Sequence, residues 1–187
     1  MQLPSVRALD FLGCRMPEQP RLLTLHTALV SAAVTAVPGV VALLTGQLLL
    51  FPSLGPTAVM VSYEPEHRSA RFYNVIVSHI GGLLSGFACV FLFGVAHAPS
   101  VFHLRVLSVP RVAAAAVAIL LAILLELVLD AAHPPATATT LLAALGSFRP
   151  TWHDGLTVVA GVLIVAVAGE LGRLLQRRMR AAHAQRR

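Results

Sequence analysis

Four long apolar runs alternate with polar stretches along the chain. They cover residues 22–44, 72–96, 112–130 and 155–175, and charged residues occur only towards the ends of the last two. A helix needs roughly 20 residues to cross about 30 Å of hydrocarbon, and each run is about that long. The pattern therefore predicts four membrane-spanning helices.

Two further apolar segments, 47–63 and 131–148, are interrupted by proline. The first contains Pro52, Gly55 and Pro56, and the second contains Pro134-Pro135. Proline lacks an N–H and disfavours helix in the residue before it, yet it is favoured at a helix start. We therefore predict short helices that begin at Pro56 and Pro135, and a preceding helix that ends near His133.

The layout is long helix, broken segment, long helix, and then the same again, in an all-α membrane protein. Interrupted segments at corresponding places in two halves are the best sequence indication of a transport site. If both segments cross the membrane, each half has three crossings and the halves are inverted. If both are re-entrant, each half has two crossings and the halves are parallel, and the arginines in the loops decide for neither.

Composition agrees with a membrane protein. Hydrophobic residues make up 57% of the 187, charged residues 12%, and a soluble domain carries about 25% charged residues. We expect residues 1–21 to form a cytoplasmic N-terminal tail, 22–175 the transmembrane domain, and 176–187 a basic cytoplasmic tail. All 14 basic residues are arginine, which is typical of GC-rich coding in some bacteria. We expect a multi-pass protein of a bacterial inner (plasma) membrane.

Several classes of partner and chemistry are not expected. The net charge of +6 comes mostly from the two ends, where arginine anchors a chain against anionic lipid, and base-reading or stacking residues for nucleic acid are absent. The two cysteines, Cys14 and Cys89, form no disulfide framework and no metal-binding spacing. We expect no cofactor, no metal and no enzymatic activity.

Candidate site residues gather at the two breaks. Glu126, Asp130 and His133 follow each other at spacings of four and three, which place them on one face of a helix. A helix start carries unpaired N–H groups and a partial positive charge, so the two short helices suit an anion. The expected anion-binding residues are His133, Pro135, Ala136, Thr137, Ser53, Gly55, Thr57, Ala58, His79 and Asn74, with Glu126 and Asp130 as proton-relay candidates.

Three motifs resemble the HPP family of integral membrane proteins in the order in which that family carries them. They are Leu54-Gly55-Pro56-Thr57-Ala58-Val59, then Asn74-Val75-Ile76 with His79, and then His133-Pro134-Pro135-Ala136. Here Pro56-Thr57 replaces the usual Ala-Ser, and Val77-Ser78 replaces a Gly-Gly before His79. The resemblance implies about four membrane spans and, since some members are linked to nitrite transport, a small inorganic anion such as nitrite as substrate.

Other interpretations remain open. One is a membrane scaffold or sensor subunit that carries no flux, and another is a membrane enzyme that uses Glu126, Asp130 and His133 as acid–base or metal groups. Asn74 and His79 also fit a structural role between helices. Ser78, Gly82 and Gly86 recur every four residues and form a helix-packing face, so we expect the chain to form a homo-oligomer.

The sharpest expectation concerns the two breaks together. Exposed backbone N–H groups inside hydrocarbon cost several kcal/mol each, so two breaks are best satisfied side by side. We expect Pro56 and Pro135 to lie close together near the middle of the protein, with His133 and His79 bordering a shared polar cavity. A histidine there could carry a proton with the anion, because histidine titrates near neutral pH.

Overall fold

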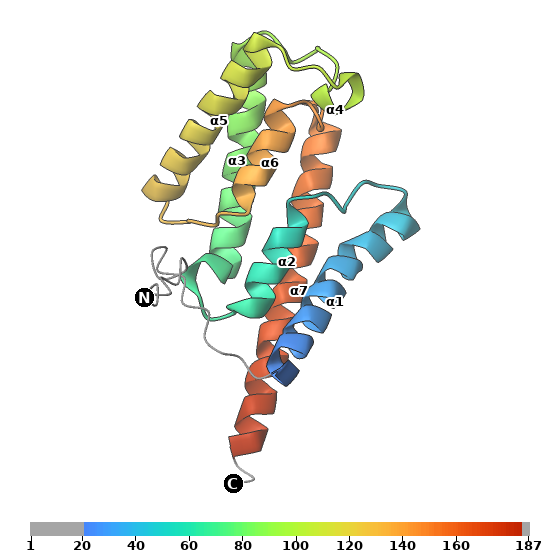
Figure 1. Ribbon diagram of the computed structural model, residues 1–187, viewed down its shortest axis with the longest axis vertical. Coiled ribbons are helices and arrows are strands. Elements are labelled where there is room, and N and C mark those ends of the chain that lie inside the picture. Colours follow the sequence, from blue (N-terminus) through green and yellow to red (C-terminus); the bar gives the residue numbers. More distant parts are fainter. Residues whose placement is uncertain (1–20, 185–187) are drawn as a thin grey trace, which may run out of the picture.

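Helices make up all the regular structure in the part of the chain that the computed structural model describes, the backbone of residues 21–184 and the side chains of 25 and 27–175 (Figure 1). In chain order the elements are α1 (Arg21–Thr45), α2 (Leu54–Tyr63), the 3-10 turn η2 (Arg68–Ala70), α3 (Phe72–Leu92), α4 (Val101–Leu104), α5 (Val109–Val128), α6 (Ala136–Ala144) and α7 (Trp152–Ala184). The all-α prediction is confirmed.

Four of these helices are long and apolar enough to cross a membrane, as the sequence predicted. The candidate spans are Thr27–Thr45, Phe72–Leu92, Val109–Val128 and Trp152–Leu175. Large aliphatic side chains stand on their outer faces; Leu43 and Leu44 on α1, for example, are 87% and 82% exposed. Such faces are stable against lipid, so the bilayer is the natural surroundings of this helix bundle.

Several predicted helix boundaries are wrong by a few residues. α2 begins at Leu54 rather than Pro56, because proline is tolerated throughout a first turn whose N–H groups lack helical partners. α5 ends at Val128, five residues before His133, and Asp130 takes a left-handed conformation with φ 52°. Glu126, Asp130 and His133 therefore do not share one helix face.

The two predicted tails are only partly covered by the described residues. α7 continues to Ala184, so residues 176–184, which we predicted as part of a separate basic tail, extend the last helix. Residues 1–20 of the predicted N-terminal tail and residues 185–187 lie outside the described residues.

The two halves of the chain run in opposite directions. In Figure 1, α1 and α3 rise while α2 descends, and in the second half α5 and α7 descend while α6 rises. The described chain thus begins and ends at the same end of the bundle. Of the two layouts that the sequence allowed, the structure has the inverted one.

Packing follows the same inversion. α1 packs on α2 and α7, and correspondingly α5 packs on α6 and α3. The last helix of each half, α3 or α7, therefore lies against the first two helices of the other half. A Cβ on Gly86 would lie 2.5 Å from the Ala143 side chain, and one on Gly169 would lie 2.7 Å from that of Val61. A close glycine contact of α3 with α6 thus recurs between α7 and α2.

The small-residue face of α3 is used inside the chain. A Cβ on Gly82 would meet Thr140 at 2.4 Å, one on Gly86 would meet Ala143, and Ser78 donates to the Ala131 carbonyl. Because α6 and the segment before it cover this face, it offers no surface for the self-association that we expected from it.

Candidate functional site

The first turns of α2 and α6 meet near the centre of the molecule, with α6 above α2 in Figure 1. Five polar side chains converge there from α2, α3, α6 and the two segments that precede the short helices. Each is at most 1% exposed: Ser53, Thr57, His79, His133 and Thr139. The two breaks therefore do come together, as the sequence predicted, and His133 and His79 both lie at the meeting point.

Hydrogen bonds join these side chains into one continuous row, which we call the histidine–hydroxyl row. Its successive contacts are Ser53 Oγ to Thr139 Oγ1 at 2.7 Å, Thr139 Oγ1 to His79 Nδ1 at 2.7 Å, His79 Nε2 to Thr57 Oγ1 at 3.0 Å, Thr57 Oγ1 to His133 Nε2 at 3.1 Å, and His133 Nδ1 to the Ser69 carbonyl at 2.7 Å.

The last contact fixes the direction of the row when both imidazoles are neutral. A carbonyl only accepts, so His133 Nδ1 carries the proton and its Nε2 must accept from the Thr57 hydroxyl. Thr57 then accepts from His79 Nε2, and His79 Nδ1 accepts from the Thr139 hydroxyl. Ser53 completes the row by donating to Thr139, so every proton has one position.

Thr57 also has an alternative acceptor. Its Oγ1 lies 3.1 Å from the Ser53 carbonyl, one helical turn back. If His133 gains a proton, its Nε2 becomes a donor, and Thr57 can accept from both imidazoles while it donates to that carbonyl instead. The site can hold one extra proton without losing a hydrogen bond.

The segment before His133 is irregular but firmly held. Four consecutive backbone carbonyls, those of residues 129–132, accept hydrogen bonds from side chains of η2 and α3. The donors are Tyr73 to Leu129, Arg68 to Asp130, Ser78 to Ala131 and Asn74 to Ala132. These bonds satisfy carbonyls of the non-helical segment that follows α5 and so position His133. Asn74 serves the site through this bond and does not join the row.

The two carboxylates that were relay candidates lie in different surroundings. The side chain of Glu126 is buried, and its carboxyl lies beside the His133 backbone N–H and the Ser78 hydroxyl. The side chain of Asp130 is 74% exposed and forms an ion pair with Arg68. Glu126 thus remains next to the row, whereas Asp130 faces outward.

The backbone donors expected at the helix starts are already paired. The N–H groups of Ala136 and Thr137 bond to the His133 and Pro134 carbonyls at 2.9 and 3.1 Å. Because α2 begins at Leu54, the N–H groups of Thr57 and Ala58 lie inside the helical ladder. The anion-binding role expected of these free N–H groups is therefore not supported.

The other candidates lie around the row. Ala58 and Ala136 are fully buried, while Gly55 and Pro135 are half-buried and Pro56 is exposed. Thr137 is half-buried, and its hydroxyl donates to the Pro134 carbonyl, so it closes the local turn.

Sequence reasoning missed two members of the site. Thr139 links His79 to Ser53, and the Ser69 carbonyl ends the row. Thr139 was accessible to sequence reasoning, because it is the fourth residue of α6 just as Thr57 is the fourth residue of α2. No sequence signal marks Ser69, since it enters through its backbone.

The donor set of the row does not resemble a metal centre. Among the described residues, no three or more His, Cys, Asp or Glu side chains form a group that could hold a metal ion. All four ring nitrogens of His79 and His133 are engaged with hydroxyls or a carbonyl.

Together, four apolar spans and two short helices that meet at a buried polar centre define a helical membrane protein with inverted halves. The family model described as HPP, transmembrane region, matches residues 16–181. The chain belongs to this family. Neither the curated proteins nor the solved structures include a match to it.

Proposed function

We propose that the protein moves a small inorganic anion across the membrane through the meeting point of α2 and α6. The observation that carries the proposal is the histidine–hydroxyl row, whose five side chains are buried in the centre of an apolar bundle. Polar groups inside membrane proteins are expensive and are found chiefly where they serve a pathway. If these five positions only had to fill space, apolar residues of the same size would do so at a lower free-energy cost.

The row supports a small, weakly basic anion, with nitrite as the candidate that other family members suggest. Hydroxyl groups of Ser53, Thr57 and Thr139 are donors without fixed charge, and binding through such groups is weak enough to allow release. One added proton on an imidazole would balance the charge of the anion. Titratable or charged groups around the row include Glu126 on α5, His67, whose Nδ1 accepts from the Ser69 backbone N–H, and the Arg68–Asp130 pair.

The row as it stands is closed, because its side chains contact one another directly and no side chain in it is more than 1% exposed. An anion would have to separate Thr57 from one of the imidazoles. Movement of α2 against α6 would do this, since Thr57 lies on α2 while Thr139 and His133 belong to α6 and the segment before it.

Uptake into proteoliposomes tests this proposal. Nitrite, nitrate, formate and chloride are compared under an imposed proton gradient, with H133A beside wild type and H153A as the matched control. His153 is exposed at the start of α7, away from the row. We expect H133A to reduce flux at least about tenfold and to change its pH dependence, and H153A to behave as wild type. Absence of uptake of all four anions by wild type, or unchanged flux and pH profile in folded H133A, would reject the proposal.

A further inference from the structure

A second polar site lies at the opposite end of α6 from the row. A cavity of about 700 Å³ opens between the end of α3, the loop before α4 and the start of α7. Its charged or titratable lining side chains are His97, His103, Arg111, Arg149 and Asp154. We call it the Arg111 cavity, and its lining residue Ala143 lies four residues, or about 6 Å along the axis of α6, from Thr139 of the row.

Arg111 carries a buried positive charge that no carboxylate neutralises. The residue is 3% exposed, and no salt bridge among the described residues involves it. Its guanidinium donates to three carbonyls: Nη1 to Ala144 at 2.9 Å, and Nη2 to Ala98 at 2.7 Å and Pro99 at 3.4 Å. Arginine has five N–H donors, so two remain, and one of them is on Nε, which has no partner.

The one carboxylate in the cavity is committed elsewhere. Asp154 Oδ2 accepts from the Arg149 backbone N–H at 2.8 Å, and Oδ1 accepts from the Thr151 hydroxyl at 3.3 Å. These contacts cap the start of α7. Even with Asp154 counted, two arginines against one carboxylate leave the lining positive, and a buried cation with free donors calls for an anion.

We propose that the Arg111 cavity binds a small inorganic oxyanion or halide. The Arg111 guanidinium supplies a buried positive charge in the cavity wall, and Arg149 adds a second positive charge to the lining. This inference does not depend on transport, because binding here can be measured on purified protein without a membrane gradient. If transport also holds, the cavity concentrates anions at the end of α6 that faces away from the chain termini.

Titration calorimetry on detergent-solubilised full-length protein tests the proposal. The probes are sodium nitrite and sodium chloride at constant ionic strength, with gluconate as the balancing anion. Ser147 lines the cavity, so S147E places a tethered carboxylate there, and S147Q is its neutral control of equal size. We expect S147E to weaken binding at least about tenfold and S147Q to leave it within about twofold.

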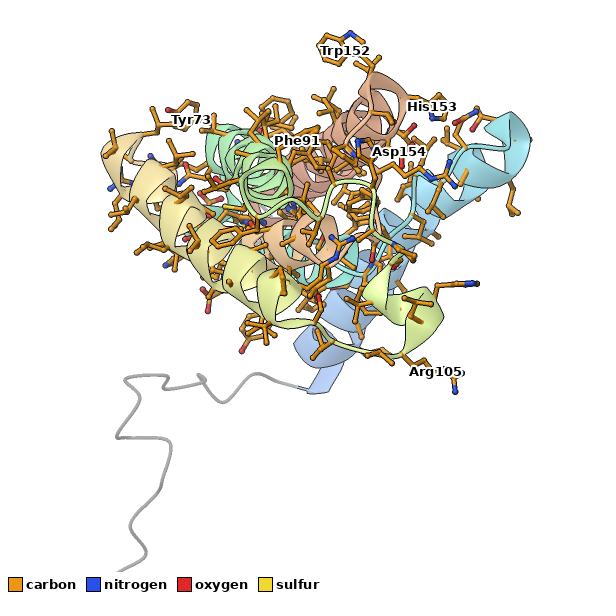
Figure 2. All side chains as sticks on the ribbon, turned by 90° about the horizontal axis from the view of Figure 1, so that it is seen from above. Tyr73, Phe91, Arg105, Trp152, His153 and Asp154 are labelled. Atoms are coloured by element: carbon orange, nitrogen blue, oxygen red, sulfur yellow. The ribbon has the colours of Figure 1, made fainter. Side chains whose placement is uncertain are left out.

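A second pair of variants removes charge rather than adding it. R149Q deletes a lining cation, and R105Q deletes a cation that points away from the molecule at the same end, as Figure 2 shows. We expect R149Q to weaken binding roughly threefold and R105Q to have no effect. Saturable binding that is lost in S147E and reduced in R149Q supports the site. Absence of saturable binding in wild type, or equal affinity in S147E and S147Q together with equal affinity in R149Q and R105Q, overturns it.

Discussion

Replacing Thr57 by valine removes the hydroxyl at the centre of the histidine–hydroxyl row while nearly preserving shape. Thr57 Oγ1 contacts His79 Nε2 at 3.0 Å and His133 Nε2 at 3.1 Å, and its residue is fully buried. In T57V both imidazole nitrogens lose their only partner in a place that water does not reach. T57S keeps the hydroxyl and loses one methyl group, so it is the matched control.

The magnitude follows from these two bonds. Hydrogen bonds between helices in a membrane protein contribute about 0.6 kcal/mol on average and up to about 1.7 kcal/mol. Losing two such bonds lowers the free energy of unfolding by roughly 1 to 3 kcal/mol. The upper part of this range applies to T57V, because the site is dry and the nitrogens have no substitute partner. The methyl lost in T57S is worth about 0.8 kcal/mol.

Reversible unfolding in mixed micelles measures the free energy of unfolding, and proteoliposome uptake of nitrite measures function. We expect T57V to lose more stability than T57S and to lose flux as well, because the proton can no longer pass between the imidazoles. A T57V protein that is as stable as T57S would refute the reasoning about the hydrogen bonds. A T57V protein that keeps wild-type flux would refute the role of the row in transport.

Three other outcomes are expected. G161A should lose about 1 to 3 kcal/mol in the same unfolding assay, because its Cβ would lie 2.4 Å from the Leu49 carbonyl oxygen, whereas G55A, with nothing within 4 Å, should be neutral or slightly stabilising. In proton-driven uptake, E126Q should lower flux and D130N should not, because only the Glu126 carboxyl lies beside the His133 backbone; equal flux in both would exclude Glu126 from the proton path. A reporter fused to the C-terminus should be active in the cytoplasm, and one inserted at residues 98–99 outside it; the reverse pattern would overturn the proposed orientation.

Much of the fold was predictable because hydrophobic length alone identifies a membrane span. The four spans and the two broken segments follow from apolar runs and from proline, both of which act locally. The end of α5 was not predictable in this way. Pro134 restricts the backbone of His133 only, yet α5 already ends at Val128. It ends there because side chains from residues 68–78 donate hydrogen bonds to the carbonyls of the segment that follows.

The site was predictable in its members more than in its chemistry. The sequence indicated that His79, His133, Ser53 and Thr57 would lie near two breaks, and the structure joins all four. It did not indicate that backbone N–H groups at both breaks would be satisfied by tight turns of their own chain, such as Ala136 to the His133 carbonyl. Side chains rather than helix starts therefore provide the polar groups at the centre.

Comparing the two inverted halves shows where the histidine–hydroxyl row departs from their symmetry. Thr57 and Thr139 occupy the same place in α2 and α6, as the fourth residue of each helix. The histidines break this symmetry. Ser78 on α3 donates to the Ala131 carbonyl, and a Cβ on Gly161 of α7 would lie 2.4 Å from the Leu49 carbonyl oxygen, so these two positions correspond and Val162 takes the place of His79.

A symmetric centre would have the same groups at its two ends, but this one does not. One end of the row is the Ser53 hydroxyl, and the other is His133 against Ser69, in the connection between α2 and α3. That connection lies at the end of the bundle where the described chain begins and ends (Figure 1). A proton that joins the row at His133 allows the Thr57 hydroxyl to turn towards the Ser53 carbonyl, so the row is chemically directional although the helices that build it are related by inversion.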